Sequence, residues 1–461
     1  MSKLFIATMV LAFTPSLAPA QDASQGNAPR PRQLRGRAVE GMIESKGDAS
    51  LQQFVEEHLA PKYRESFATP EKLLEHLRAI REACSDFGGV LVDPVGDYGL
   101  LMKFMHEGSE TAVMMQLDTS PPHQIVALDL QKGEARTSGP EVAPITWDNL
   151  ATRLDEEAAS GFAATVLVVR GGKIVLHKGY GLANRERNIS NGTETIFAIG
   201  SVPIDFTRGA ILKLEEQGKL YASDPITKHL ANVPADKQSM TIDHLMNRKS
   251  GLPDFHHLAG VDKDPDLSWI DRDTAVKRIL SATLLFPPGE GDAHSHSAWV
   301  LLAAMVEIVS KQPYGGFVRE HFFAPARMER TGNHEDAERF ADDQFAIGYD
   351  ADSVGKLNIT KYWGKTSWLV MGSGGMQSNP MDLYRWNQSI RTGKTLSAEA
   401  SKKYWHDGIL AGGDDRGFFT MYNEGPGDMF IMCSNAHSGP GDRVSKVGRR
   451  LAELVTGRSL R

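Results

Sequence analysis

Residues 197–207 read Phe-Ala-Ile-Gly-Ser-Val-Pro-Ile-Asp-Phe-Thr, and this stretch decides the fold. Ser201 comes just before a run of apolar residues with helical spacing, and Pro203 suits the first turn of a helix. The pattern predicts a helix that begins near Ser201 and ends at Gly218. Ile204 follows Ser201 by three residues, about one helical turn, so its side chain is expected to face the serine.

Strand patterns lie at both ends of the region that begins near Pro144, and a mainly helical region over 223–395 separates them. The first pair is a hairpin around Gly171-Gly172, and the second precedes a helix over 442–455. The predicted strands cover residues 164–169, 173–179, 417–423 and 428–434. Strands at both ends with helices between them predict one sheet that is closed by distant chain segments.

The N-terminal third reads as three different segments. Residues 1–20 have a lysine, an apolar run and Ala18-Pro19-Ala20, which predicts a signal peptide cleaved after Ala20 and an exported, periplasmic or extracellular protein. Residues 21–38 are polar and rich in proline and glycine, which predicts a disordered linker. Residues 39–143 change from helical to strand periodicity, which predicts a small α+β domain whose architecture resembles cystatin/NTF2-like accessory domains.

Composition excludes several function classes. The chain has 461 residues, is 41% hydrophobic and carries a net charge of −7, with no long basic cluster. It is therefore expected to be globular, with no nucleic-acid partner and, since no apolar stretch is long enough, no membrane span. Its two cysteines, Cys84 and Cys433, fall in different predicted domains, which favours two buried free thiols over a disulfide.

Several motifs of residues 144–461 follow one another in a characteristic order. They are Lys178-Gly-Tyr-Gly-Leu-Ala-Asn184, Phe197-Ala-Ile-Gly-Ser201, Asp224-Pro225, Ser250-Gly-Leu-Pro253, Phe286-Pro-Pro-Gly289, Gly372-Ser-Gly-Gly-Met376 and Ser434-Asn435. In this order they resemble the class C β-lactamase-related serine hydrolases, within the β-lactamase and penicillin-binding-protein family. The resemblance implies an α/β (α+β) fold, with an antiparallel sheet flanked by helices and a helical subdomain.

The chain departs from the family at three catalytic positions. The lysine expected three residues after the serine is Ile204, and the Tyr-x-Asn motif is replaced by His294-Ser295-His296. The basic residue of the third motif is also missing, because the best match is Leu410-Ala411-Gly412-Gly413. Lys365-Thr366-Ser367 imitates that motif in letters, but it precedes the Gly372–Met376 loop and is expected to be a surface segment.

Two interpretations of Ser201 and His294 remain open. Ser201 could be a nucleophile with His294, in the place of the family's tyrosine, as its general base. Alternatively, Ser201 only caps its helix and His294 only fills the vacated cleft. The resemblance places His296, Gly412 and Gly413 among residues that contact a ligand. Two histidine pairs, His294 with His296 and His256 with His257, could also bind a transition metal. No nearby Glu-x-x-His or cysteine pattern supports this, so no metal or other cofactor is expected.

Two functions are therefore compatible with the sequence. The lost basic residues favour a catalytically degenerate homologue that binds a peptide, a cell-wall fragment or a protein partner in the former cleft. The alternative is an atypical serine hydrolase or esterase that uses Ser201 as nucleophile and His294 as base. The sequence does not determine the oligomeric state.

Overall fold

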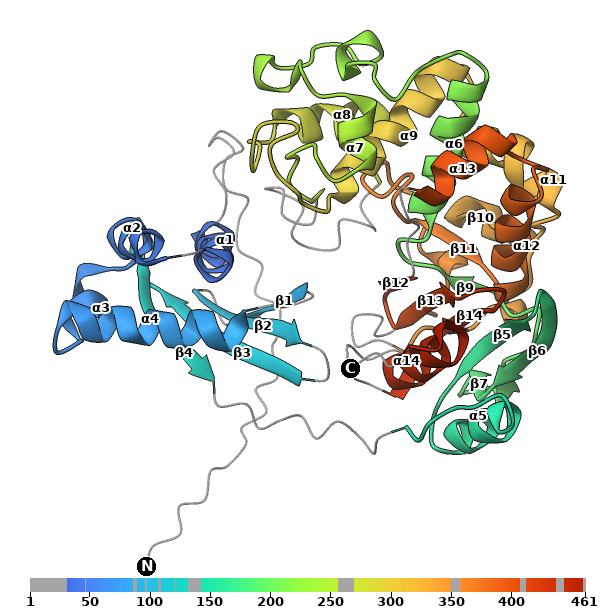
Figure 1. Ribbon diagram of the computed structural model, residues 1–461, viewed down its shortest axis with the longest axis horizontal. Coiled ribbons are helices and arrows are strands. Elements are labelled where there is room, and N and C mark those ends of the chain that lie inside the picture. The colour runs from blue at the N-terminus through green and yellow to red at the C-terminus, as the bar shows by residue number, and fades with distance from the viewer. Residues whose placement is uncertain are drawn as a thin grey trace, which may run out of the picture.

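The computed structural model describes residues 31–45, 47–85, 89–95, 98–106, 109–120, 122–131, 142–255, 269–349, 357–406, 412–436 and 443–458. The expected signal peptide lies outside these residues. The described chain builds an N-terminal domain with a hydrophobic core of its own and a larger C-terminal domain (Figure 1).

The N-terminal domain packs helices against one antiparallel sheet. The sheet runs in the order β1-β2-β3-β4, so each strand pairs with its neighbour in the chain. The helices are α1 (Pro31–Glu44), α2 (Asp48–His58), α3 (Pro61–Glu65) and α4 (Pro70–Cys84), and the strands are β1 (Gly89–Val95), β2 (Gly99–His106), β3 (Ser109–Leu117) and β4 (Ile125–Gln131). The predicted change from helices to strands is therefore present, while the cystatin/NTF2-like resemblance stays a prediction.

Helix α1 begins at Pro31, whereas the sequence predicted disorder up to residue 38. The reason is Arg35, which is 6% exposed. Its guanidinium donates to the carbonyls of Glu57, Pro122 and His123 and is hydrogen-bonded to His58 Nδ1 at 2.6 Å. A polar composition predicted a solvated segment, but the five donors of one arginine tie this helix to α2 and to the loop before β4.

The C-terminal domain is built on a five-stranded antiparallel sheet in the order β12-β13-β14-β5-β6. Strands from the two ends of the domain meet where Phe430 of β14 pairs with Val168 of β5. The strands are β5 (Ala164–Arg170), β6 (Lys173–Tyr180), β12 (Gly412–Asp415), β13 (Phe418–Glu424) and β14 (Met429–Ser434). The predicted hairpin, second strand pair and sheet closed by distant segments are all present.

Helices cover both sides of this sheet (Figure 1). One core places β5 and β14 against the first and last helices of the domain, α5 (Leu150–Ala159) and α14 (Arg443–Thr456). The other core joins the sheet to the helical subdomain. Its helices include α6 (Pro203–Glu216), α7 (Ile242–Met246), α8 (Arg272–Ser281), α9 (His296–Ser310), α10 (Tyr314–Val318), α12 (Pro380–Arg391) and α13 (Ala398–His406).

Small strands and turns complete the domain. Strand β11 (Met376–Ser378) lies between β9 (Phe197–Ala198) and β10 (Gly332–Asn333), and β7 (Leu182–Asn184) pairs with β8 (Ile189–Ser190). The remaining helical segments are short: Ile226–Lys228, Ala235–Lys237, Arg319–Phe323, α11 (Ala324–Ala326), His334–Arg339, Asp342–Gln344 and Thr360–Tyr362.

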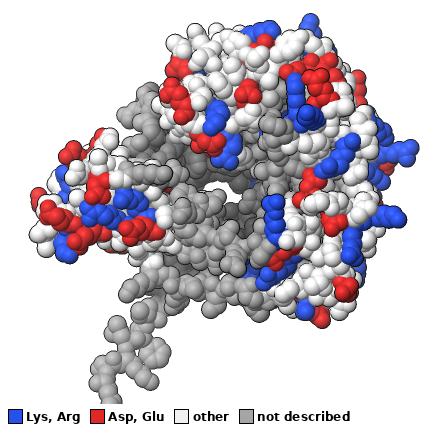
Figure 2. Space-filling view, viewed as in Figure 1, with Lys and Arg blue, Asp and Glu red and all other residues white. Residues whose placement is uncertain are grey.

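The cysteines and the surface agree with the composition. Cys84 and Cys433 are buried free thiols, as the sequence favoured, and burial raises the pKa of each to about 12. Basic and acidic side chains are interspersed on the visible face rather than separated into a basic surface (Figure 2). Among the described residues, no helix combines the length and the apolar character that crossing a bilayer requires.

The burial of His334 makes the stability of the protein depend on pH. Its imidazole is 2% exposed, and neither ring nitrogen has a hydrogen-bond partner among the described residues. Burial, and secondarily the charge of Arg416, lowers its pKa to about 3. The unfolded chain therefore binds a proton below about pH 6.5 while the native state does not, so stability falls as the pH falls from about 6.5 towards 3.

Replacing His334 with leucine should remove much of this acid sensitivity. The variant should be about as stable as the wild type near pH 7 and more stable than it near pH 4, because the cost of keeping one imidazole neutral disappears. All seven tryptophans follow residue 146, so urea unfolding followed by tryptophan fluorescence reports on the C-terminal domain alone. A His123→Leu control in the N-terminal domain should keep the wild-type dependence. Equal acid sensitivity in both variants would contradict the assignment.

Candidate active site

Ser201 lies at the turn that starts α6. Its carbonyl accepts from the Ile204 amide at 3.1 Å, and the N-cap residue of the helix is Val202, which makes no side-chain cap. The interpretation of Ser201 as a helix cap is therefore wrong. Its Oγ lies instead 2.9 Å from Nε2 of His296, the first residue of α9.

His296 is oriented by a carboxylate that the sequence analysis did not single out. Asp254 Oδ2 lies 2.7 Å from His296 Nδ1 and accepts the His296 amide at 2.8 Å. A carboxylate at Nδ1 requires the proton on that nitrogen, which leaves the Nε2 lone pair to accept the Ser201 hydroxyl proton. The side chains of His296 and Asp254 are 17% and 13% exposed. A hydroxyl, an imidazole and a carboxylate linked in this order can act as a nucleophile, a base and an orienting acid.

Backbone contacts between two loops bring Asp254 to His296. The segment 248–251 pairs with the segment 285–293 through the bonds Leu285 N to Gly251 O, Gly289 N to Lys249 O and Ala293 N to Arg248 O, at 2.7–2.9 Å. Gly251 has a φ of +71°, and a Cβ there would lie 2.0 Å from the carbonyl oxygen of Phe286. The glycine of the Ser-Gly-Leu-Pro motif thus allows the backbones of the two segments to approach closely. The residue that follows the motif, Asp254, then lies at the N-terminus of α9.

A glycine turn fixes α6 against α9. Gly372 has a φ of +79°, and a Cβ there would lie 2.5 Å from Cβ of Ala303 on α9. Its carbonyl accepts from Thr207 Oγ1 of α6 at 2.7 Å. The Gly372–Met376 motif therefore packs between α6, which follows the serine, and α9, which begins at His296.

His294, which the sequence proposed as the base, lies beside the histidine that is hydrogen-bonded to Ser201. The ring nitrogen at 2.9 Å from Ser201 Oγ belongs to His296, which the sequence had placed among the binding residues. The His294 ring is exposed and contacts the His296 ring edge-on, with centroids 4.8 Å apart. The Phe255 ring also contacts the His296 ring, with centroids 5.6 Å apart. The sequence signal that could have indicated this arrangement is an aspartate directly after Leu-Pro, together with the two histidines of the segment 294–296.

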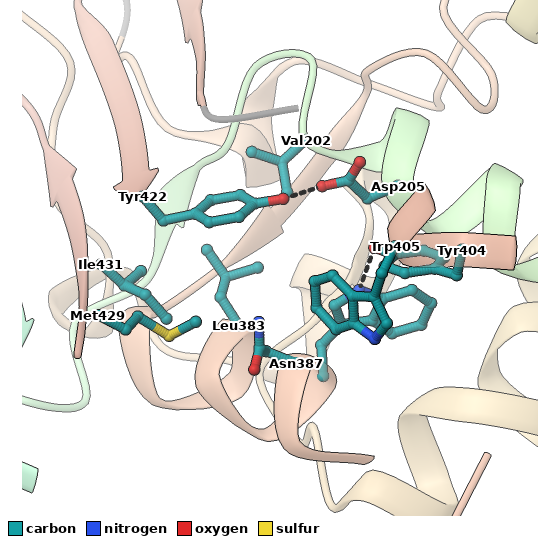
Figure 3. Close-up of a pocket in the computed structure, with 10 residues that line it drawn as sticks. Val202, Asp205, Leu383, Asn387, Tyr404, Trp405, Tyr422, Met429 and Ile431 are labelled. Atoms are coloured by element: carbon teal, nitrogen blue, oxygen red, sulfur yellow. Dashed lines mark hydrogen bonds between the residues drawn. The ribbon is translucent and has the colours of Figure 1, made fainter. Parts of the chain in front are cut away.

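The side of α6 next to the serine carries no lysine. Ile204 is 4% exposed and belongs to the apolar core. The next residue, Asp205, is buried and is hydrogen-bonded to Tyr422, whose pKa burial raises well above its usual value. Figure 3 shows this pair in a small pocket. Its lining also includes Val202, Leu383, Trp386, Asn387, Tyr404, Trp405, Met429 and Ile431. Val202, the residue after Ser201, therefore lines this pocket together with four aromatic side chains.

Strand β12 passes close to the backbone of Ser201. It is an edge strand, and a Cβ at Gly413 would lie 2.2 Å from the backbone nitrogen of Ser201. Gly412 precedes it on the same strand. Two of the residues that the sequence assigned to ligand binding therefore lie beside Ser201, whereas Leu410 and Ala411 lie outside the described residues. Lys365 is exposed, but Thr366 and Ser367 are fully buried, so the prediction of a surface segment is wrong for those two.

Gly413→Ala should impair the site more than it impairs the fold. The added methyl meets backbone, which cannot rotate away, so β12 has to move from the Ser201 amide. We expect phosphonate labelling of Ser201 to slow by at least about tenfold, since catalytic geometry tolerates shifts well below 1 Å. Gly41→Ala, at an exposed glycine of α1 with nothing within 4 Å of its added methyl and no positive φ, is the surface control. Unchanged labelling in Gly413→Ala would refute the close approach.

Comparison with known proteins places the chain in a family. A family model described as Beta-lactamase matches residues 148–444. The Bacillus subtilis (strain 168) protein PbpX is 32% identical over 248 residues, which cover 54% of this chain and 60% of PbpX. Protein flp of Staphylococcus aureus (strain MW2) is 30% identical over 238 residues, covering 48% and 46%. The chain thus spans about half to three fifths of the length of these relatives.

Solved structures share the fold at lower identity. A penicillin binding protein from Bacillus halodurans matches with a TM-score of 0.52 and 23% identity, covering 64% of this chain and 98% of that one. The D-amino acid amidase of Ochrobactrum anthropi SV3 matches with a TM-score of 0.55 and 20% identity, covering 65% and 94%. The resemblance and fold class inferred from the motifs are confirmed: the chain belongs to the β-lactamase family.

Proposed function

We propose that this protein is a serine hydrolase of ester or amide bonds that uses a Ser201–His296–Asp254 triad in place of the family's serine–lysine–tyrosine chemistry. The observation that carries the proposal is the continuous hydrogen-bond chain from Ser201 Oγ through both ring nitrogens of His296 to Asp254. A serine hydroxyl needs a base at neutral pH, and this chain supplies one although Ile204 cannot.

The first half of the reaction forms an acyl-enzyme. Ser201 Oγ attacks the carbonyl carbon of the substrate while its proton passes to His296 Nε2. Asp254 keeps the Nδ1 proton in place and stabilises the imidazolium. The carbonyl oxygen becomes an oxyanion, for which the Ser201 amide at the start of α6 is a donor and the backbone of β12 a source of a second one. Collapse of the intermediate breaks the bond to the alcohol or amine, which leaves with the proton from Nε2.

The second half releases the acid. A water molecule attacks the acyl carbon as His296 Nε2 takes one of its protons, and the collapsing intermediate expels Ser201 Oγ, which recovers that proton from His296. Strand β12 is an edge strand of the described sheet and passes beside Ser201, which supports a substrate with an extended, peptide-like backbone, because such a backbone can pair with an edge strand. A cell-wall peptide fragment is therefore the ligand class we favour.

A fluorophosphonate probe tests the proposal directly. The probe should bond covalently to Ser201 in the wild type, and mass spectrometry should locate it on the peptide that contains that residue. Ser201→Ala should remain unlabelled at this peptide. Absence of labelling in folded wild type would favour the inactive, ligand-binding homologue.

We also propose that the protein acts outside the cytoplasm. The leader pattern of residues 1–20 supports export. Expression of the full chain in a bacterial host, followed by fractionation and N-terminal sequencing, should give a periplasmic or secreted form that begins at Gln21. A cytoplasmic product that retains Met1 would contradict export.

A further inference from the structure

Three side chains at the mouth of the active site form a cluster with metal-ligand chemistry. One ligand atom from each of Asp254, His294 and His296 lies within 4.8 Å of the other two. Two imidazoles and one carboxylate form a common ligand set of Zn²⁺ in proteins, with the fourth position left to water. This cluster differs from a plain acidic patch, because it has two imidazole groups, which transition metals prefer as ligands and Ca²⁺ or Mg²⁺ do not.

The distances allow a metal ion after a small movement. Zinc bonds of about 2.0–2.1 Å in a tetrahedron put neighbouring ligand atoms about 3.3–3.4 Å apart. The most distant pair in the cluster thus has to close by no more than about 1.5 Å. His294 is exposed and lies two residues before the start of α9, so rotation of its side chain can supply much of this movement. Asp254 Oδ2 and His296 Nδ1, which are 2.7 Å apart, have to separate by about 0.6 Å if the metal binds both atoms.

We propose that this cluster is an inhibitory site for Zn²⁺ or a similar divalent transition metal. Both nitrogens of His296 are already used, Nε2 by Ser201 and Nδ1 by Asp254. If the metal binds Nε2, Ser201 loses its base. If it binds Nδ1, the Nδ1 proton is released and the contact with Asp254 is replaced. One hydrogen bond of the triad is lost in either case, so occupancy of the metal site and catalysis exclude one another.

His294 is the residue that distinguishes this site from the triad. It takes no part in the proposed proton transfer, yet it completes the metal ligand set. The inhibitory effect rests on the proposed hydrolase function, whereas metal binding itself rests only on the geometry of the cluster. A spectroscopic measurement of binding can therefore succeed or fail independently of any activity.

Cobalt titration of the full chain tests the binding step. After treatment with a chelator, the wild type should bind one Co²⁺ with the visible absorption typical of low-coordinate nitrogen and oxygen ligation. His294→Ala should weaken binding by at least about tenfold, because even the loss of a residue that only orients a metal ligand typically costs about 10–100-fold in affinity. Zn²⁺ should displace the cobalt. His123→Ala, in the N-terminal domain, is the matched control and should bind as the wild type does. Absence of one-to-one binding, or equal affinity in His294→Ala, would overturn the site.

Phosphonate labelling tests the inhibitory step. Zn²⁺ should suppress labelling of Ser201 in the wild type, and a chelator should restore it. In His294→Ala, suppression relative to its own zinc-free rate should need at least about tenfold more zinc. Cobalt binding without any effect of zinc on labelling would overturn the inhibitory role but not the site. A wild type that binds cobalt and is never labelled would refute the hydrolase function alone.

Discussion

Replacing His296 with alanine should slow phosphonate labelling of Ser201 by about 10²–10⁴-fold, the contribution typical of a positioned general base. Nε2 of His296 is the ring nitrogen at hydrogen-bond distance from the nucleophile, and alanine leaves the hydroxyl without it. The measurement is the second-order rate of labelling at neutral pH. A melting curve followed by tryptophan fluorescence should establish that the variant is folded.

Two further variants separate the possible bases. Asp254→Asn should also slow labelling strongly, because an amide can hold His296 in the wrong tautomer, with its lone pair on Nδ1 rather than Nε2. His294→Ala should slow it much less. The opposite order, with His294→Ala labelled poorly and His296→Ala labelled well, would return the base to the residue that the family motif indicates.

Most of the fold was predictable because its signals are local. The hairpin at Gly171-Gly172 and the strand pair around Glu424-Gly-Pro-Gly each follow from a few neighbouring residues. The order of the family motifs supplied the rest. The one segment misjudged in the N-terminal domain, 31–38, failed because Arg35 is stabilised by residues 22 to 88 positions away.

The site was less predictable for the same physical reason. Asp254 and His296 are 42 positions apart, and Ser201 and His296 are 95 apart. The order of the motifs equates His294 with the family's tyrosine. It does not show whether the side chain of His294 or that of His296 points towards the serine. Ser295 caps α9 and donates to the Pro253 carbonyl, and Asp254 takes the first amide of the helix. These long-range contacts, rather than the order of the letters, decide that His296 meets Ser201.

Restoring the family's lysine should fail, and it should be costly. Ile204→Lys places an ammonium among apolar neighbours where Ile204 is 4% exposed. The acceptor beside Ser201, Nε2 of His296, already receives the Ser201 hydroxyl. Burying a charge without a partner costs several kcal/mol, so we expect the free energy of unfolding to fall by about 3–5 kcal/mol. Ile204→Val, which removes one methyl group, is the control and should cost about 1 kcal/mol.

The Ile204→Lys substitution should also fail to produce hydrolysis of a cephalosporin. The family's chemistry needs its three motifs together, and residues that act as a unit contribute little one at a time. With histidines at 294 and 296 and leucine at 410, neither wild type nor Ile204→Lys should hydrolyse a chromogenic cephalosporin faster than Ser201→Ala does. Urea unfolding and the cephalosporin assay check the two halves of this prediction. A stability equal to the wild type would contradict the first half of the prediction, and turnover gained with the lysine would contradict the second.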